Sequence, residues 1–289
     1  MTLTGPIVLA VLFGALLHAA WNAFIKAGRD KALDTALVHS LGIFVAIPLL
    51  MHTGLPERAA WPYMAASLAI HLGYYIALAG AYKHGDLGLT YPLMRGCAPL
   101  LVALGSLAFI GERISTTAWI GVGVLSVGVF TLGLSRSTPA PDGISHRGKA
   151  IGFALANAAI IAVYTVVDGI GVRVSGNAVA YVAGLFVFDG IPYMLLVLWR
   201  RPGQRVAALN YMKGRWPIAF VGTAASLGSY GVALWAMTRA PVAVVAALRE
   251  TSVLFAALIG TFFLRETFGW QRAIGTVVIA AGVMALRLG

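Results

Sequence analysis

The chain has 289 residues, of which 60% are hydrophobic and 11% are charged, and its formal net charge is +11 at pH 7. Soluble globular domains are about 45–50% apolar, so this composition excludes a soluble fold and favours a chain embedded in a bilayer. The positive charge does not indicate nucleic-acid binding, because the basic residues lie in short connections without interleaved aromatic side chains. The single cysteine, Cys97, makes a disulfide within the chain impossible.

Apolar runs near 20 residues recur from end to end, and each is long enough to cross a bilayer as a helix. The first run lacks preceding Lys or Arg and a clear cleavage site, so we interpret it as a span and not a signal peptide. We place the runs at residues 5–25, 35–53, 62–83, 87–110, 116–134, 149–168, 178–199, 216–238, 241–264 and 269–287. The predicted fold is therefore an all-α integral membrane protein with ten transmembrane helices.

Most Lys and Arg residues lie in the connections after the first, third, fifth, seventh and ninth runs. Because cytoplasmic loops are enriched in these residues, we expect those connections on the cytoplasmic side and both termini outside. Two exceptions, Arg95 and Arg249, lie inside apolar runs.

The two halves of the chain repeat each other. TYPLMRGCAPLLVALGS, which begins at Thr90, aligns with VVAALRETSVLFAALIG, which begins at Val244. In this alignment Arg95 falls on Arg249, and further matches pair Glu112 with Glu266, Gly121 with Gly275 and Gly128 with Gly282. A polar linker at 135–148 separates a first repeat, 1–134, from a second, 149–289. Five spans in each repeat give the two copies opposite orientations in the membrane, the inverted-repeat design of secondary carriers.

Three segments resemble the drug/metabolite transporter superfamily and, within it, the EamA-domain family: HGDLGLTYPLMRGCAPLLVAL with its GER ending, TRAPVAVVAALRETSVLFAALIG with LRET, and YTVVDGIGVR. The resemblance implies two EamA domains, secondary transport and a multi-pass location in a bacterial-type inner membrane. Its nearest general likeness is to YddG-type amino-acid exporters. Small multidrug pumps of the same superfamily use a glutamate in their first helix, where this chain has His18, Trp21 and Asn22.

The membrane arginines have two interpretations. Each can offer a fixed cation to a substrate carboxylate or phosphate, since a charge at bilayer depth is costly and is usually functional. Alternatively, each bonds helix-end carbonyls, or Arg249 pairs with its neighbour Glu250. Because the repeats are inverted, we expect Arg95 and Arg249 at opposite faces, as gates.

A polar, aromatic cavity is the predicted substrate site. His71, Tyr75 and Tyr82 share one helical face, which lines a cavity or else forms an interfacial belt. Asn22 either joins helices or lines the pathway. The full set of predicted cavity residues is Trp21, Asn22, His71, Tyr74, Tyr75, Tyr82, Tyr91, Arg95, Tyr164, Tyr230, Trp235 and Arg249.

Other polar residues receive mainly structural predictions. Asp168 is expected in a loop salt bridge, and Asp189 is expected to pair with an arginine or bind a proton. Glu112 and Glu266 are expected to cap the helix that follows each. The paired glycines, spaced by seven, are expected to make 116–134 and 269–287 closely packed scaffold helices.

No enzyme motif, metal-ligand spacing or cofactor motif emerges. The sequence predicts a monomeric transporter whose partners are the lipid bilayer and one small polar metabolite. The resemblance implies that this metabolite is an amino acid, which the protein exports by alternating access. The alternatives are a sugar-phosphate or nucleotide exchanger, a passive uniporter or channel, and an intramembrane enzyme that acts on lipids.

Overall fold

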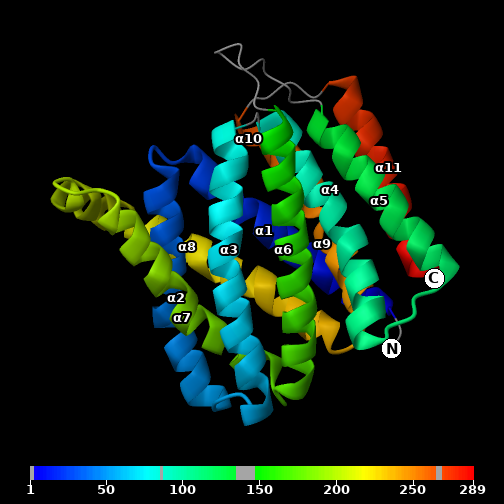
Figure 1. The fold of residues 1–289 in the computed structure, drawn as a ribbon, viewed down its shortest axis with the longest axis horizontal. Coiled ribbons are helices and arrows are strands. Elements are labelled where there is room, and N and C mark those ends of the chain that lie inside the picture. The colour runs from blue at the N-terminus through cyan, green and yellow to red at the C-terminus, as the bar shows by residue number, and fades with distance from the viewer. Residues whose placement is uncertain (1–2, 85–86, 135–146, 265–268) are drawn as a thin grey trace.

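The computed structural model describes residues 3–84, 87–134, 147–264 and 269–289. Within these ranges every regular element is helical, as predicted (Figure 1). The elements are α1 (Gly5–Ala27), α2 (Lys31–Thr53), the 3₁₀ turn η1 (Arg58–Ala60), α3 (Trp61–His84), α4 (Leu87–Gly105), the π turn η2 (Ser106–Ile110), α5 (Thr116–Leu134), α6 (Arg147–Val174), α7 (Ala178–Trp199), α8 (Arg205–Met237), α9 (Val242–Arg249), α10 (Ser252–Leu264) and α11 (Trp270–Leu288).

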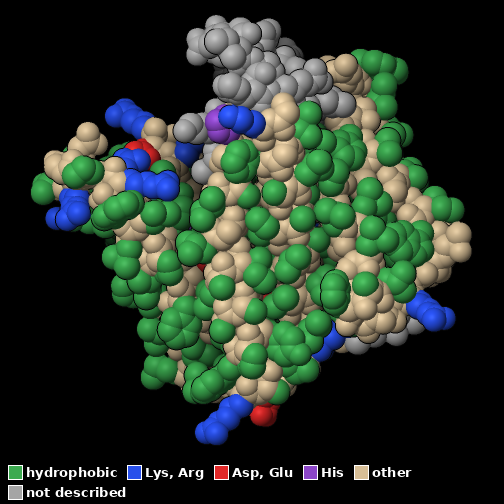
Figure 2. All heavy atoms as spheres, in the orientation of Figure 1, with side chains coloured by type: hydrophobic (Ala, Val, Ile, Leu, Met, Phe, Trp, Pro, Cys, Tyr) green, Lys and Arg blue, Asp and Glu red, His purple; other side chains and the backbone are tan. Residues whose placement is uncertain are grey.

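Length and composition give eight candidate membrane spans among the described residues, with a shorter apolar stretch in α5. The His- and Tyr-rich α3 is not among them. The chain is thus a multi-pass membrane protein. Figure 2 shows hydrophobic side chains across the middle of one face and Lys and Arg side chains near its margins.

Three predicted boundaries were wrong. The run 241–264 is interrupted: α9 ends at Arg249 and α10 begins at Ser252. The hydroxyl of Thr251 donates to the carbonyl of Leu248 at 2.7 Å, a local bond that competes with helix continuation. Helix α8 begins at Arg205 and not at 216, because polar helix-forming residues precede its apolar part, and its start projects from the bundle (Figure 1). Helix α6 continues past 168 to Val174.

The paired glycines make the close helix contact that was predicted, and the structure shows that α5 and α11 make it with each other (Figure 1). A Cβ on Gly128 would lie 2.8 Å from the backbone nitrogen of Ile279, and one on Gly282 would lie 2.8 Å from that of Leu125. Gly121 and Gly275 have equally close neighbours on the opposing helix. Only glycine permits this backbone approach, so α5 and α11 form a tightly packed pair beside the rest of the bundle.

The remaining helices pair across the two halves of the chain. Helix α2 packs on α7, α3 on α6, α1 on α8, and α4 on α6. Where α2 crosses α7, a Cβ on Gly190 would lie 2.4 Å from the carbonyl oxygen of His39. This close crossing brings the polar side chains beside it into contact, and it borders the cavity described next.

Candidate functional site

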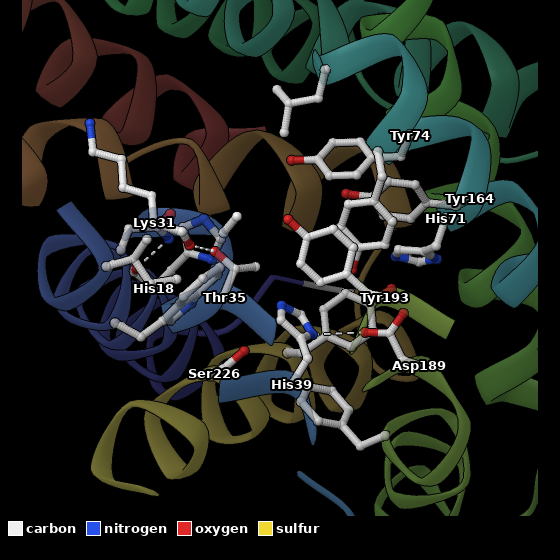
Figure 3. A pocket seen from close by; sticks show the side chains of 18 of the residues that line it. His18, Lys31, Thr35, His39, His71, Tyr74, Tyr164, Asp189, Tyr193 and Ser226 are labelled. Carbon is white, nitrogen blue, oxygen red and sulfur yellow. Dashed lines mark hydrogen bonds and ion pairs between the residues drawn. The ribbon is translucent and has the colours of Figure 1, made fainter. Parts of the chain in front are cut away.

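A cavity of about 610 Å³ lies among α1, α2, α3, α4, α6, α7, α8 and α9 (Figure 3). The structure brings ten predicted residues to its wall: Trp21, Asn22, His71, Tyr74, Tyr75, Tyr91, Arg95, Tyr164, Tyr230 and Arg249. Trp235 instead borders a separate pocket, where the Arg239 guanidinium lies 4.5 Å from the centre of its ring. The side chain of Tyr82 lies outside the described residues. Whether these residues bind a substrate remains a prediction.

The two membrane arginines face the same cavity, so the expectation of opposite faces was wrong. Arg95 lies eight residues beyond Leu87, where α4 begins, and Arg249 lies seven residues beyond Val242, where α9 begins. At 1.5 Å per residue these spacings correspond to about 10–12 Å along each helix, far enough to reach toward the middle of a core about 30 Å thick.

The arginines differ in their partners. The Nε of Arg95 lies 2.9 Å from Oε2 of Glu250, and its Nη2 donates to the hydroxyl of Ser252 at 3.2 Å. Glu250 therefore pairs with Arg95 and not with its neighbour Arg249. Within the described residues Arg249 has no ion pair; its guanidinium lies 5.2 Å from the centre of the Tyr230 ring. One of the two cations is thus neutralised by the protein, whereas the other has only an aromatic contact.

Aromatic side chains form one wall of the cavity (Figure 3). The rings of His71 and Tyr164 lie 4.4 Å apart between centres, and Tyr74 meets Tyr164 edge-on at 6.3 Å. Tyr75 stacks on Tyr193 of α7 at 4.7 Å. The predicted stripe on α3 therefore faces other aromatic residues across the cavity. Tyr193 was missed because nothing in α7 marks its orientation toward α3.

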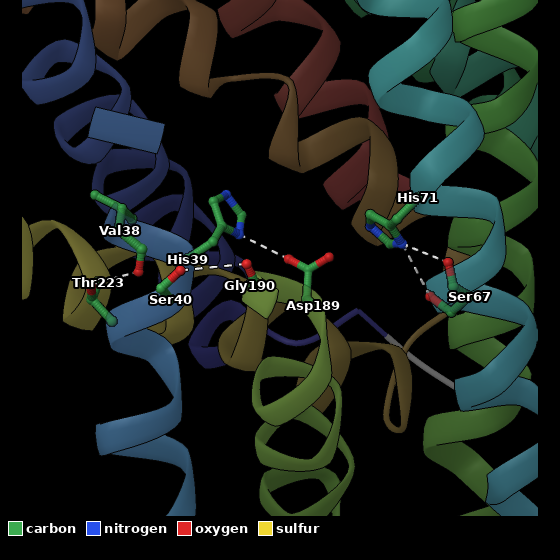
Figure 4. A network of polar contacts seen from close by, with 8 residues as sticks. All are labelled: Val38, His39, Ser40, Ser67, His71, Asp189, Gly190 and Thr223. Atoms are coloured by element: carbon green, nitrogen blue, oxygen red, sulfur yellow. Dashed lines mark hydrogen bonds and ion pairs between the residues drawn. The ribbon is translucent and has the colours of Figure 1, made fainter. Parts of the chain in front are cut away.

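A histidine–carboxylate pair joins α2 to α7 at the cavity (Figure 4). Nδ1 of His39 lies 2.8 Å from Oδ2 of Asp189, and the two side chains are 14% and 16% exposed. The predicted partner of Asp189 was an arginine or a proton, and the structure places a histidine there. His39 was missed because the crossing at Gly190, which brings α2 close, cannot be read from helical periodicity.

Asp168 is buried and does not form the predicted loop salt bridge. Its carboxylate accepts hydrogen bonds from the hydroxyls of Ser67 at 3.0 Å, Tyr181 at 2.9 Å and Tyr230. The continuation of α6 past Asp168 places it inside the bundle, where hydroxyl groups satisfy it. Asp168 thereby orients the Tyr230 ring that lies against Arg249.

Glu112 closes one end of the bundle. Its Oε1 accepts from Nη2 of Arg173 at 2.5 Å, and its Oε2 accepts from the backbone N–H of Val242 at 2.8 Å. The Nε of Arg173 also donates to the carbonyl of Met237 at 2.8 Å. Glu112 therefore caps α9 and not the helix that follows it, whose Ala118 N–H donates to Ser115 at 3.0 Å. Glu266 lies outside the described residues.

The opposite end of the cavity reaches the exposed residues Lys31 and Arg200. Beside it, Arg201 donates to both oxygens of Asp30, at 2.5 and 3.0 Å. The hydrogen bond from this guanidinium holds the pKa of Asp30 below its ordinary value. The basic end thus borders the cavity, whereas the Glu112 end is tied by side chains from both halves of the chain.

The described residues contain no group of three or more His, Cys, Asp or Glu side chains able to hold a metal. The cavity offers ionic and aromatic recognition: Arg249 is a cation without an ion pair among the described residues, and Asp189 presents a carboxylate.

Comparisons with known proteins agree with a transporter fold. Residues 148–288 match the model of the EamA-like transporter family. Two curated proteins, from two strains of Pseudomonas aeruginosa, are each named "Probable 4-amino-4-deoxy-L-arabinose-phosphoundecaprenol flippase subunit ArnF" and are 33% identical to this chain over 87 residues. The match covers 30% of this chain and 64% of each relative, so the chain spans less than two thirds of their length.

A solved structure described only as "Crystal structure of protein" superposes with a TM-score of 0.71 over 98% of this chain and 95% of its own, at 20% identity. That likeness establishes the fold alone. The EamA-like match and the apolar helices together indicate a membrane transporter rather than an enzyme.

Proposed function

We propose that this protein is a secondary transporter that carries one small polar metabolite with a carboxylate, most simply an amino acid, by alternating access. The observation that carries the proposal is Arg249, which lines the cavity without an ion-pair partner among the described residues. A guanidinium binds a carboxylate through two parallel hydrogen bonds. The neighbouring Arg95 is already paired with Glu250, so a monoanionic group matches the one available cation near the centre.

The volume of the cavity supports a small substrate. Ligand pockets of about 300–1,000 Å³ bury drug-sized molecules, and this cavity of about 610 Å³ lies within that range. A sugar-phosphate or nucleotide exchanger fits less well. A multiply charged substrate needs several converging cations, whereas Lys31 and Arg200, the further described basic residues on the wall, lie at its mouth.

The difference between the two ends of the cavity supports alternating access. Glu112 and Arg173 tie one end, and the other end reaches exposed basic residues. By the distribution of Lys and Arg, the second end is the cytoplasmic one. The structure then corresponds to a state open to the cytoplasm, in which a cytoplasmic metabolite enters before export.

The pairing of helices supports two inverted five-helix repeats with ten spans. If α1 corresponds to α6, α2 to α7, α3 to α8, α4 to α9 and α10, and α5 to α11, then the main contacts between the two halves have counterparts. The α1–α8 contact corresponds to α3–α6, whereas α2–α7 and α5–α11 each correspond to themselves. A two-fold relation between the repeats produces this pattern.

A second candidate function is movement of a lipid-linked amino sugar, favoured by the 33% identity to the flippase subunits over 87 residues. The name of those relatives includes an amine and a phosphate, and the available cation matches the phosphate. Vesicles distinguish the two functions, because an amino-acid carrier accumulates a water-soluble solute, whereas a flippase moves a lipid between leaflets.

The experiment is counterflow of the standard amino acids into vesicles that contain the purified protein. We expect Arg249→Gln to weaken the apparent affinity by about 10- to 150-fold, since a hydrogen bond to a charged group contributes about 1.5–3 kcal/mol. Arg249→Lys should restore only part of it, because lysine lacks the planar fork.

The matched control is Arg239→Gln. Arg239 also lies over an aromatic ring, at 4.5 Å from its centre, but borders the separate pocket. Equal transport by the Arg249→Gln and Arg239→Gln variants would refute the role of Arg249. Absence of counterflow for every amino acid would refute amino-acid transport, and movement of a labelled lipid-linked amino sugar would then support the second candidate.

A further inference from the structure

The His39–Asp189 pair lines the cavity but has no role in the proposed binding of a substrate carboxylate by Arg249. It lies on α2 and α7, whereas the arginines lie on α4 and α9. Oδ2 of Asp189 contacts His39, and Oδ1 has no hydrogen-bond partner among the described residues. Both side chains are partly exposed to the cavity, at 14% and 16%. A carboxylate with an available acceptor oxygen is therefore presented to any solute inside.

Aromatic rings surround this pair. Trp21 meets the His39 ring edge-on at 6.0 Å, and Tyr75 does so at 6.5 Å. Tyr193 stacks on Tyr75 from the α7 side. Aromatic rings attract ammonium groups, and a carboxylate beside them supplies the opposite charge. The enclosure and the carboxylate together define a cation subsite.

We infer that Asp189 binds the ammonium group of the transported molecule, and that a proton on His39 occupies this subsite when the molecule is absent. The inference rests on the proposed function. In the empty state protonated His39 is the counter-ion of Asp189. When the ammonium group binds Asp189, His39 releases its proton to the water of the cavity. One positive charge enters the subsite and one leaves, so the protein exchanges one proton for one substrate molecule.

The surroundings leave His39 as the proton carrier of this subsite. Besides the pair, the titratable or charged groups that line the cavity are His18, Lys31, His71, Tyr74, Tyr75, Tyr91, Arg95, Tyr164, Tyr193, Arg200, Tyr230 and Arg249. Nδ1 of His71 already lies 2.8 Å from the carbonyl oxygen of Ser67, so that nitrogen donates to a neutral acceptor. His18 packs edge-on against Trp21, at 5.3 Å between ring centres, and the indole separates it from the pair.

The test measures ligand binding and proton release with the full-length purified protein. The standard amino acids are supplied one at a time, and the tightest binder is compared with its 2-hydroxy analogue, which keeps the carboxylate and replaces the ammonium group with a hydroxyl. In the wild-type protein we expect a preference for the amino acid and release of about one proton per molecule bound in weakly buffered solution. The 2-hydroxy analogue should release none.

Two variants separate the parts of the inference. Asp189→Asn should reduce the preference for the amino acid over the hydroxy acid by about 10-fold or more while hydroxy-acid binding persists. His39→Gln keeps the carboxylate, so it should keep the preference but abolish proton release. Asp30→Asn is the matched control, because it removes a carboxylate that does not line the cavity. Each variant is checked for an unchanged gel-filtration profile.

The outcomes are distinguishable. If the wild type binds no amino acid, the proposed function fails and the inference fails with it. If the wild type binds amino acids but Asp189→Asn discriminates as the wild type does, the subsite at Asp189 is refuted and the proposed function stands. Should Asp189→Asn not fold, His39→Gln decides alone: undiminished proton release would overturn the exchange.

Discussion

Glu112→Gln should loosen the end of the bundle that the Glu112–Arg173 ion pair holds together. The two side chains are 13% and 17% exposed, so their 2.5 Å ion pair is largely shielded from water. Glutamine keeps a carbonyl oxygen for the Val242 N–H but loses the charge that faces Arg173. A hydrogen bond between charged groups contributes about 1.5–3 kcal/mol. A loss of about 2 kcal/mol from the closed state shifts the equilibrium about 30-fold toward the open one.

Thiol labelling measures this shift. Ser229, which is buried and lines the cavity, is replaced by cysteine in a Cys97→Ala background. A membrane-impermeant reagent is added only on the side of the chain termini, where the Glu112 end lies. Labelling should accelerate up to about 30-fold in Glu112→Gln, since the reagent reaches the cavity only through the open state. Glu57→Gln, an exposed carboxylate at the same end, is the control. If the two variants label equally slowly, Glu112 does not hold the end closed.

Two further predictions concern stability in detergent, measured by thermal unfolding. Gly128→Ala should destabilise the protein by about 1–3 kcal/mol, because its Cβ would lie 2.8 Å from the Ile279 backbone. The control is Gly123→Ala on the same helix, where a Cβ would have no atom within 4 Å, so this variant should be neutral or slightly stabilising. Equal melting temperatures of the two variants would contradict the glycine contact. Asp30→Asn keeps the α2 cap but loses the Arg201 ion pair, at a cost of about 1 kcal/mol or less at pH 7. Because the pKa of Asp30 is lowered in the folded state, its contribution is present above the unfolded pKa of about 3.9 and is lost as pH falls through the folded pKa. The difference from wild type should therefore shrink as pH falls below about 3.9, and a difference that stays constant or grows in acid would show that it has another cause.

The features predicted well from the sequence were those encoded within one helix. The glycines spaced by seven in α5 and α11 predicted close helix contacts, because a missing side chain lets any neighbouring helix approach; they did not predict that the two helices contact each other. The stripe on α3 and the membrane arginines pointed to a polar interior for a similar reason, since an apolar span makes each polar residue conspicuous.

The features that were missed depend on where two distant helices cross. Arg95 contacts Glu250, which lies 155 positions later in the sequence, and His39 contacts Asp189, which lies 150 positions later. Helical periodicity relates residues of one helix and cannot predict contacts between such distant residues. The break after Arg249 carries no Pro or Gly, and Thr251, whose hydroxyl bonds locally, is too common inside helices to have marked it. Glu112 was expected to act on the next helix in sequence, but its acceptor oxygens reach α9 because that helix begins beside it in space.

The break between α9 and α10 has a consequence for how the chain enters the membrane during synthesis. At 1.5 Å per residue, the 8 residues of α9 extend about 12 Å and the 13 residues of α10 about 20 Å, so neither crosses a core about 30 Å thick. The turn between them places Glu250 at depth, where Arg95 of the earlier-made α4 supplies its counter-charge. Because α4 precedes α9 and α10 in the chain, we expect synthesis to supply Arg95 before Glu250, the charge that it pairs with.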